Sequence, residues 1–284
     1  MNKLVLLGIV VVAACQADNR NLERKLDELS KKLDKLDGQL ARGAGAQAQR
    51  PPARPEPDRA KTYAVPVDGD PFEGPADAKV TVVKAYDYAC PFCEKVRDTM
   101  DDLRKKYGND LRVVYKQFVV HPQVATAPAL AVCAAAKQGK FREIDTLIWD
   151  KGFKGRQFDK DASDAAGQSQ RCWESAAGCP VVLGYAQELG LNADKFKADM
   201  KGECQQLLQK DMKDLTALGV GSTPTFFING RYMVGAAPAE SFSTLIDEEL
   251  KKANEKIAAG TPAASYYQQV IVDKGLKQLE RPQQ

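Results

Sequence analysis

One stretch of the chain, VTVVKAYDYACPFC (residues 80–93), joins a run of strand-forming residues to two cysteines, Cys90 and Cys93. A polar, helix-forming stretch, residues 94–106, follows at once, so Cys90 falls at a predicted helix N-terminus. Unpaired backbone N–H groups and the helix dipole favour negative charge there, which pushes the Cys90 thiol towards thiolate. Cys93 lies one turn on, close enough to attack a mixed disulfide formed by Cys90. This arrangement predicts dithiol–disulfide exchange.

A metal site is the alternative interpretation of this spacing. Zinc sites use the same C-x-x-C pattern, but they require a second pair of ligands. The other cysteines form no second C-x-x-C, and the sequence has a single histidine, His121, which we interpret as structural. We therefore favour a redox site and expect neither a metal nor a cofactor.

The overall charge argues against nucleic acid as a partner. The net charge is +3 and the pI is about 8.3, with acidic and basic residues interleaved along the chain. No stacking-aromatic motif of a nucleic-acid module is present. At 284 residues the length allows one or two domains.

The N-terminus has the pattern of an export signal. An apolar run, residues 4–12, is too short to span a bilayer and is followed by Val12-Ala13-Ala14-Cys15, which resembles a bacterial lipobox. This predicts a lipoprotein signal peptide over residues 1–14 and a lipid on Cys15, although ordinary cleavage nearby with Cys15 incidental is the alternative. Of seven cysteines, removing Cys15 from the count leaves six, enough for three pairs in a compartment that permits disulfides.

Leucines at heptad spacing follow the lipobox. The members of this seam are Leu22, Leu26, Leu29, Leu33, Leu36 and Leu40. A seam so narrow on so charged a helix cannot bury itself in a globular core, so it predicts a coiled-coil helix within residues 15–41 that associates with copies of itself. A solvated helical spacer is the alternative, since about three heptads is near the lower limit for stable association. Residues 42–62, rich in Pro, Ala and Gly, then read as a linker.

The remainder alternates between strand and helix signals. Strands are predicted over residues 80–86, 111–118, 225–228 and 231–235, with an Asn229-Gly230 hairpin turn between the last two. Helical segments are predicted over residues 94–106, 129–138, 141–149, 181–189, 194–218 and 239–256. The order is strand, helix, strand, helical insert, hairpin and final helix. It predicts an α/β chain with a thioredoxin fold and an inserted α-helical domain.

This order and three local motifs resemble the DsbA-like thiol–disulfide oxidoreductases of the bacterial envelope. The motifs are DYACPFC (residues 87–93), QGKF (residues 138–141) and GVGSTPTFFING (residues 219–230). The resemblance covers roughly residues 63–260, with the insert at about 122–219 and a C-terminal tail at 261–284. It implies that Cys90 is the exposed nucleophile, that Cys93 is the buried resolving thiol, and that Pro91 and Phe92 tune the redox potential.

The resemblance also implies a substrate-binding loop. Thr223-Pro224 matches the loop whose proline is cis in this family and faces the active-site sulfurs. A cis bond there exposes the backbone of the preceding residue for strand-like pairing with an extended substrate.

One position departs from the family pattern. Many thioredoxin-fold proteins carry an acidic residue six positions before the first cysteine, where it accepts the proton of the resolving thiol. Lys84 occupies that position here. A nearby cation favours a thiolate rather than acting as the usual base, unless the side chain extends away to solvent. Lys84 is therefore expected to tune the site, and the proton-transfer scheme of the family does not carry over directly.

The four remaining cysteines, Cys133, Cys172, Cys179 and Cys204, lie in the helical region and predict structural disulfides. Cys172 and Cys179 bracket a short loop that a disulfide could close, in which case Cys133 and Cys204 tie the first insert helix to the last. Sequence alone leaves the other pairings open.

These features predict a lipid-anchored enzyme on the periplasmic side of the cell envelope. Its expected partners are exported proteins with cysteines, a membrane redox protein, the membrane itself through Cys15, and further copies of the chain. We favour an isomerase slightly over an oxidase, because a coiled-coil-linked multimer resembles isomerases that use paired sites. A monomeric oxidase or reductase, a copper- or zinc-handling protein and an anchored scaffold with a vestigial site are the alternatives.

Overall fold

The computed structural model describes residues 21–35, 56–161 and 171–279. The chain divides into two compact units, Met1–Arg54 and Pro55–Gln284. In the first unit, residues 21–35 form one helix whose seam leucines, Leu22, Leu26, Leu29 and Leu33, are each 56–62% exposed. The predicted signal peptide, Cys15, Leu36, Leu40 and most of the predicted linker lie outside the described residues.

A five-stranded sheet forms the centre of the second unit, in the order β1-β3-β2-β4-β5. Its strands are β1 (Phe72–Glu73), β2 (Val80–Tyr86), β3 (Leu111–Gln117), β4 (Thr225–Ile228) and β5 (Arg231–Val234). β2 and β3 are parallel, and the other pairs are antiparallel. The turn between β4 and β5 is the predicted Asn229-Gly230, and both residues have positive φ, as a tight hairpin turn requires.

Successive side chains of β2 point alternately into two hydrophobic cores, one on each face of the sheet. Val82 and Tyr86 point into one core together with residues of two helices, Arg97–Tyr107 (α3) and Ala239–Ala258 (α9), whereas Val83 and Ala85 point into a second core on the other face. Because side chains alternate along a strand, Lys84 lies on the same face as Val82 and Tyr86.

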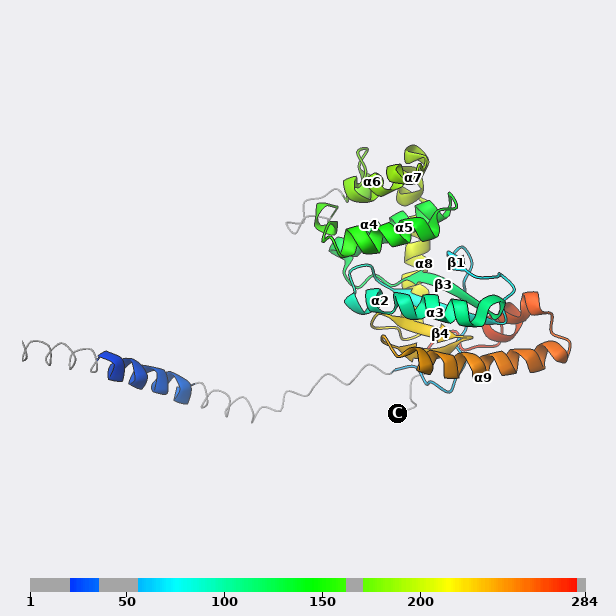
Figure 1. Cartoon of the computed structure of the whole chain (residues 1–284), viewed down its shortest axis with the longest axis horizontal. Helices are drawn as coiled ribbons and strands as arrows, with labels where there is room; N and C mark the ends of the chain where they lie inside the picture. The colour runs from blue at the N-terminus through cyan, green and yellow to red at the C-terminus, as the bar shows by residue number, and fades with distance from the viewer. Residues whose placement is uncertain (1–20, 36–55, 162–170, 280–284) are drawn as a thin grey trace, which may run out of the picture. The chain divides into compact units, whose positions relative to one another are not determined.

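Helices surround this sheet and form the insert. The helices are α2 (Pro91–Lys95), α3 (Arg97–Tyr107), α4 (Pro122–Ala136), α5 (Phe141–Leu147), α6 (Pro180–Glu188), α7 (Ala193–Lys201), α8 (Glu203–Ala217) and α9 (Ala239–Ala258). Short 3-10 helices are η1 (Gly108–Asp110), η3 (Phe158–Lys160), η4 (Cys172–Glu174) and η5 (Ala263–Ser265), and two π-helices are η2 (Ile148–Phe153) and η6 (Tyr267–Val272). Figure 1 shows α4 to α7 stacked apart from the sheet, with α8 running from them towards it.

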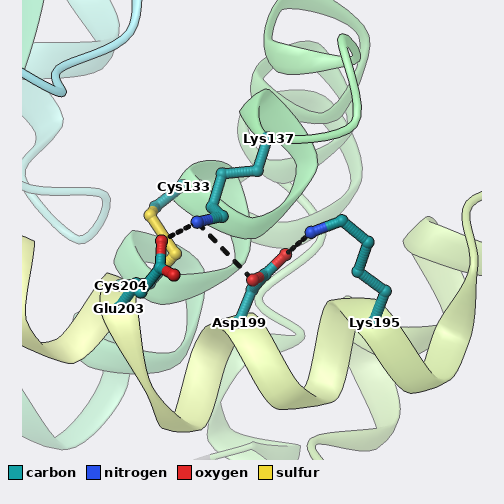
Figure 2. Close-up of a disulfide and its surroundings, with 6 residues drawn as sticks. All are labelled: Cys133, Lys137, Lys195, Asp199, Glu203 and Cys204. Carbon is teal, nitrogen blue, oxygen red and sulfur yellow. Dashed lines mark hydrogen bonds and ion pairs between the residues drawn. A yellow bond between two sulfur atoms is a disulfide. The ribbon is translucent and has the colours of Figure 1, made fainter.

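Two disulfides hold the insert together. Cys133 of α4 is bonded to Cys204 of α8, and Cys172 is bonded to Cys179 across the short loop between them. Beside the first disulfide, the Lys137 ammonium contacts the carboxylates of Glu203 and Asp199, and Lys195 contacts Asp199 at 2.7 Å (Figure 2). The two ends of the insert are therefore tied by a covalent bond with ion pairs around it.

The folded unit is longer at both ends than the predicted boundaries of 63 and 260. Thr62 forms a bridge with Arg231, and the Arg231 side chain donates to the backbone oxygen of Arg59 at 2.7 Å, so the end of the predicted linker is part of the fold. The predicted C-terminal tail also packs on the second core, through side chains that include Tyr266 and Ile271. Residues before 63 and after 260 therefore belong to the folded unit.

Candidate active site

Cys90 lies at the N-terminus of α2, where the chain leaves β2. It is the residue immediately before the helix, and Pro91 occupies the first helical turn. The backbone oxygen of Cys90 accepts hydrogen bonds from the N–H groups of Cys93 at 3.1 Å and Glu94 at 3.3 Å. The sequence therefore gives Cys90 the expected position, next to the unpaired N–H groups of a helix end.

The two thiols differ in environment. Cys93 is fully buried, whereas the neighbouring Phe92 is 60% exposed. Cys90 is 5% exposed, so it is less accessible than the exposed nucleophile that the resemblance implies. Both cysteines are free thiols.

Their acidities diverge accordingly. The pKa of Cys90 is lowered from 9.0 to about 5, and the hydrogen bond from Cys93 is the largest cause. Burial opposes this shift, while Thr223 and the backbone N–H groups of Cys93 and Phe92 contribute to it. Burial raises the pKa of Cys93, and its hydrogen bond to Cys90 adds to this rise. At neutral pH Cys90 is thus a thiolate and Cys93 a thiol.

The Thr223–Pro224 loop faces Cys90. Its peptide bond is cis, and the Cys90 sulfur lies 3.3 Å from the backbone oxygen of Thr223. The Thr223 hydroxyl oxygen is buried and has no hydrogen-bond partner within the described part of the chain. Its hydrogen can therefore turn towards the Cys90 thiolate.

Asp87 connects the cysteine loop to the end of β3, a role that the sequence analysis missed. One carboxylate oxygen accepts from the N–H of Ala89 at 2.6 Å, and the other accepts from Val120 at 2.6 Å and His121 at 2.8 Å. His121 also lies 3.2 Å away through its ring Nδ1, in agreement with a structural role. An aspartate three residues before a helix-capping cysteine is a turn-forming pattern that points to such a role.

Lys84 is buried beneath the site and does not extend to solvent. It is 2% exposed, and its ammonium lies 5.1 Å from the ring centroid of Tyr86 and 5.7 Å from that of Tyr115. Burial lowers its pKa, while the negative charge of Asp145 and then of Cys93 opposes this effect. Burial likewise raises the pKa of Asp145, and Lys84 opposes it. Asp145 was not singled out from the sequence.

The structure thus brings the Thr223–Pro224 loop next to the Cys90–Cys93 segment, including Pro91 and Phe92, where β2 ends and β4 begins, and Lys84 lies within β2, paired with Phe226 of β4. The disulfides of the insert join other elements, α4 to α8 and the two ends of the loop between Cys172 and Cys179. The described residues hold no group of three or more His, Cys, Asp or Glu side chains arranged to ligate a metal ion. None of the helices in the described segments has the length and apolar character that a bilayer crossing requires.

Sequence comparison supports the fold. The thioredoxin family model matches residues 67–248. The Na(+)/H(+) antiporter NhaA of Herminiimonas arsenicoxydans is 30% identical over 185 residues, which is 64% of this chain and 26% of that protein. NhaA 1 of Salinispora arenicola is 32% identical over 190 residues, which is 64% of this chain and 25% of that protein. The chain thus spans about a quarter of the length of these curated relatives.

Solved structures share the architecture. A thioredoxin-like oxidoreductase from Silicibacter pomeroyi has a TM-score of 0.50 and 24% identity, covering 65% of this chain and 94% of its own. Oxidised BdbD from Bacillus subtilis has a TM-score of 0.50 and 20% identity, covering 69% of this chain and 100% of its own. Alpha-DsbA1 from Wolbachia pipientis has a TM-score of 0.52 and 16% identity, covering 68% and 96%. The chain therefore belongs to the thioredoxin family, and its fold is that of the DsbA-like thiol–disulfide oxidoreductases.

Proposed function

We propose that this protein catalyses thiol–disulfide exchange in exported proteins of the bacterial cell envelope, with Cys90 as the nucleophile and Cys93 as the resolving thiol. The position of the Cys90 sulfur carries the proposal. It lies at a helix N-terminus, 3.3 Å from the Thr223 backbone oxygen, and Cys90 is three residues before a fully buried second thiol. A thiolate held beside a backbone that can pair with an extended polypeptide suits attack on a cysteine of an unfolded chain.

The exchange proceeds in two balanced steps. A substrate thiolate attacks the Cys90 sulfur of the Cys90–Cys93 disulfide, a new S–S bond forms, and the electron pair of the broken bond goes to Cys93. A second substrate thiolate then attacks the substrate sulfur of the mixed disulfide and releases Cys90 as thiolate. The substrate leaves oxidised, and the enzyme retains two reduced cysteines.

The acidity of Cys90 supports oxidation or isomerisation over reduction. A pKa near 5 stabilises the reduced form of the pair, because Cys90 remains ionised at neutral pH. Stabilising the reduced form makes the disulfide form a stronger oxidant. A reductase needs the opposite balance, so the reductase alternative is the less favoured one.

The exposed leucine seam of helix 21–35 supports isomerisation. Four leucines at heptad spacing, Leu22, Leu26, Leu29 and Leu33, are all more than half exposed in the single chain. Association of such seams in two or more chains buries them. Several active sites then share one substrate at high effective concentration, which favours repeated exchange. A monomeric oxidase is the alternative, and a metal-handling thiol protein is less favoured.

The proposed location follows from the sequence. A lipid on Cys15 holds the chain on the periplasmic side of a membrane, and the linker lets the catalytic domain reach exported substrates. A membrane redox protein reoxidises or reduces the Cys90–Cys93 pair. Labelling with a radioactive fatty acid tests the anchor, because Cys15→Ser should abolish incorporation.

Trapping tests the chemistry itself. The oxidised protein should oxidise a peptide dithiol stoichiometrically, and Cys90→Ser should abolish this activity. With a disulfide-bonded peptide as substrate, Cys93→Ala should attack the peptide disulfide through Cys90, release one peptide thiolate and accumulate the mixed disulfide, because the resolving thiol is absent. Cys133→Ala/Cys204→Ala is the matched control, since it removes a disulfide outside the site. Oxidation that survives Cys90→Ser would contradict the proposal.

A further inference from the structure

Strand geometry directs Lys84 towards the core that contains Cys93. Lys84 is in the middle of the central strand β2, opposite Tyr115 of β3 and Phe226 of β4. Its neighbours on the same face, Val82 and Tyr86, belong to the hydrophobic core that includes Cys90 and Cys93. Lys84 is therefore removed from solvent and lies on the face of the sheet that is covered by the core containing both cysteines.

Few groups can balance the charge of Lys84 in this core. The charged and titratable groups facing it are Asp145 and Arg142 of α5, Cys93 of α2, Arg97 of α3, Tyr86 of β2 and Tyr115 of β3. Among them only Asp145 and Cys93 favour the ammonium by becoming negative, and both arginines oppose it. A carboxylate of the insert and the resolving thiol are thus the two groups whose negative charge favours the Lys84 ammonium.

Asp145 is held in place from several sides. Its Oδ1 accepts from the Tyr88 hydroxyl at 2.7 Å and from the Trp149 indole N–H at 3.1 Å. Tyr88 in turn accepts from Tyr86 at 3.1 Å, and Tyr86 accepts from the Gln117 amide at 2.6 Å. Burial raises the pKa of Asp145, and the Lys84 charge and the Tyr88 hydrogen bond oppose that rise by favouring the carboxylate.

From this arrangement we infer that the Lys84 ammonium supplies the proton to Cys93 when Cys93 leaves the disulfide, and that Asp145 of the insert is the positioning residue that keeps Lys84 protonated. The inference deepens the proposed exchange activity and rests on it. It assigns to a lysine–aspartate pair the proton handling of the resolving thiol.

Atoms and electrons balance in each direction. An attacking thiolate bonds to the Cys90 sulfur, the electron pair of the Cys90–Cys93 bond goes to Cys93, and Cys93 takes a proton from the Lys84 ammonium. The neutral Lys84 amine then regains a proton from water. In the reverse direction the amine removes the Cys93 proton, and the resulting thiolate attacks the Cys90 sulfur of a mixed disulfide.

Burial shifts the pKa values of Lys84 and Cys93 in opposite directions, as proton transfer from Lys84 to Cys93 requires. It lowers the pKa of Lys84 and raises the pKa of Cys93, so a proton moves from the ammonium to the leaving thiolate. The same order slows release of a substrate by Cys93, because Cys93 must first lose its proton. A mixed disulfide that persists suits oxidation or isomerisation better than reduction.

Reduction of the oxidised full-length protein by dithiothreitol isolates this step. The rate per dithiothreitol thiolate, followed by acid quench and mass analysis, should fall as pH rises through the Lys84 titration. Lys84→Met should lower the rate at neutral pH by at least about tenfold and remove this pH dependence, since a general acid is lost. Lys84→Arg should also remove the pH dependence while retaining part of the rate, because a guanidinium keeps its charge but donates no proton. Asp145→Asn should move the inflection to lower pH.

Lys116 provides the matched control. It is a buried lysine on the adjacent strand β3, it faces the second core, and it is paired with Asp70 and Asp211 at 2.6 Å each. Lys116→Met should leave the rate and its pH profile unchanged. An unchanged profile in both Lys84→Arg and Asp145→Asn, or an equal change in Lys116→Met, would overturn the inference. Exchange through Cys90 that persists in those variants would leave the proposed function intact.

Discussion

Cys90 and Cys93 are separated by only two residues, yet the fold gives them opposite acid–base behaviour. Hydrogen bonds from Cys93 and from backbone N–H groups at the helix N-terminus lower the pKa of Cys90, whereas Cys93 is enclosed by the core. Hydrogen bonds outweigh burial at the Cys90 sulfur, and burial outweighs them at the Cys93 sulfur. This difference supports the proposed roles of Cys90 as the nucleophile and Cys93 as the resolving group.

The Cys93 side chain should account for much of the acidity of Cys90. Its hydrogen bond is the largest cause of the lowered pKa, so Cys93→Ala should raise the pKa of Cys90 from about 5 towards 9.0. Cys93→Ser keeps a donor and should keep the pKa low. Thiolate absorbance during a pH titration measures both variants. Equal pKa values in the two variants would show that the helix N-terminus, and not Cys93, controls Cys90.

In the wild type, mild reduction followed by brief alkylation at neutral pH should modify Cys90 alone. Cys93 is fully buried and its pKa is raised, so it remains an unreactive thiol. Mass mapping of the alkylated peptide identifies the residue. Modification of Cys93 first would reverse the assignment of the two roles.

Asp87 should contribute to stability through three backbone N–H groups. Asp87→Ala leaves the N–H groups of Ala89, Val120 and His121 without their acceptor. We expect the free energy of unfolding to fall by about 1–3 kcal/mol, as for a buried group that loses its partner. Urea denaturation measures the change. Asp98→Ala, an exposed acid on α3, is the control and should have little effect.

Local motifs predicted the reacting residues of the site but not their surroundings. Cys90, Cys93 and the Thr223–Pro224 loop are each marked by adjacent residues, so sequence alone identifies them. Asp145 reaches the site only because α5 of the insert packs against the Cys90–Cys93 region. Such a contact depends on tertiary packing, which no local pattern encodes.

At the scale of elements, strong periodicity predicted strands and helices well, and weak periodicity did not. β2 has the predicted boundaries, and β3 ends one residue earlier than predicted. The predicted helix 194–218 is two helices, α7 and α8, because the backbone changes direction at Gly202. β1 has two residues, Phe72 and Glu73, and is too short to show alternation.

The contact between α8 and β3 should make the fold sensitive to pH. Asp70 and Asp211 share the Lys116 ammonium in a fully buried cluster, and burial followed by the charge of Asp211 raises the pKa of Asp70 to about 7. The folded state therefore binds this proton more tightly than the unfolded chain. The stability that it gives is complete below the unfolded pKa of about 4 and is lost as pH rises through the folded value.

Asp70→Asn tests this linkage. The amide resembles the protonated acid, so the variant should show a smaller loss of unfolding free energy between about pH 4 and pH 7 than the wild type. Urea denaturation across that range measures the slope. Asp68→Asn, an exposed acid two residues away, should retain the wild-type slope. A wild-type slope in Asp70→Asn would place the pH sensitivity elsewhere.

At the scale of the whole molecule, the chain combines a catalytic unit with a helix that lacks a core of its own. Every described seam leucine of helix 21–35 is more than half exposed. Burial of the apolar surface of several leucines, which stabilises by about 25 cal/mol per Å², is the driving force for association between chains. The mature soluble chain, without its lipid, should therefore be a dimer or larger.

Removal of residues up to Ala41 should yield a monomer, because the seam is then absent. Light scattering on both proteins at the same concentration measures the mass. Leu26→Lys/Leu33→Lys in the longer chain is a matched variant that keeps the length and disrupts the seam. A monomeric mass for the unmodified mature chain at tens of micromolar would contradict association through this helix.

Association should matter for isomerisation more than for oxidation. Isomerisation requires a reduced Cys90 to stay near a partly unfolded substrate through successive exchanges, and neighbouring sites raise its effective concentration. Oxidation needs only one Cys90–Cys93 disulfide, so the monomer should retain oxidase activity.

We expect the mature multimer to restore the activity of a scrambled multi-disulfide protein faster per active site than the truncated monomer and the double lysine variant. Both monomers should oxidise a peptide dithiol at the rate of the multimer. Equal isomerisation per site in all three proteins would make the helix a spacer and would favour the oxidase, because no shared substrate is then needed.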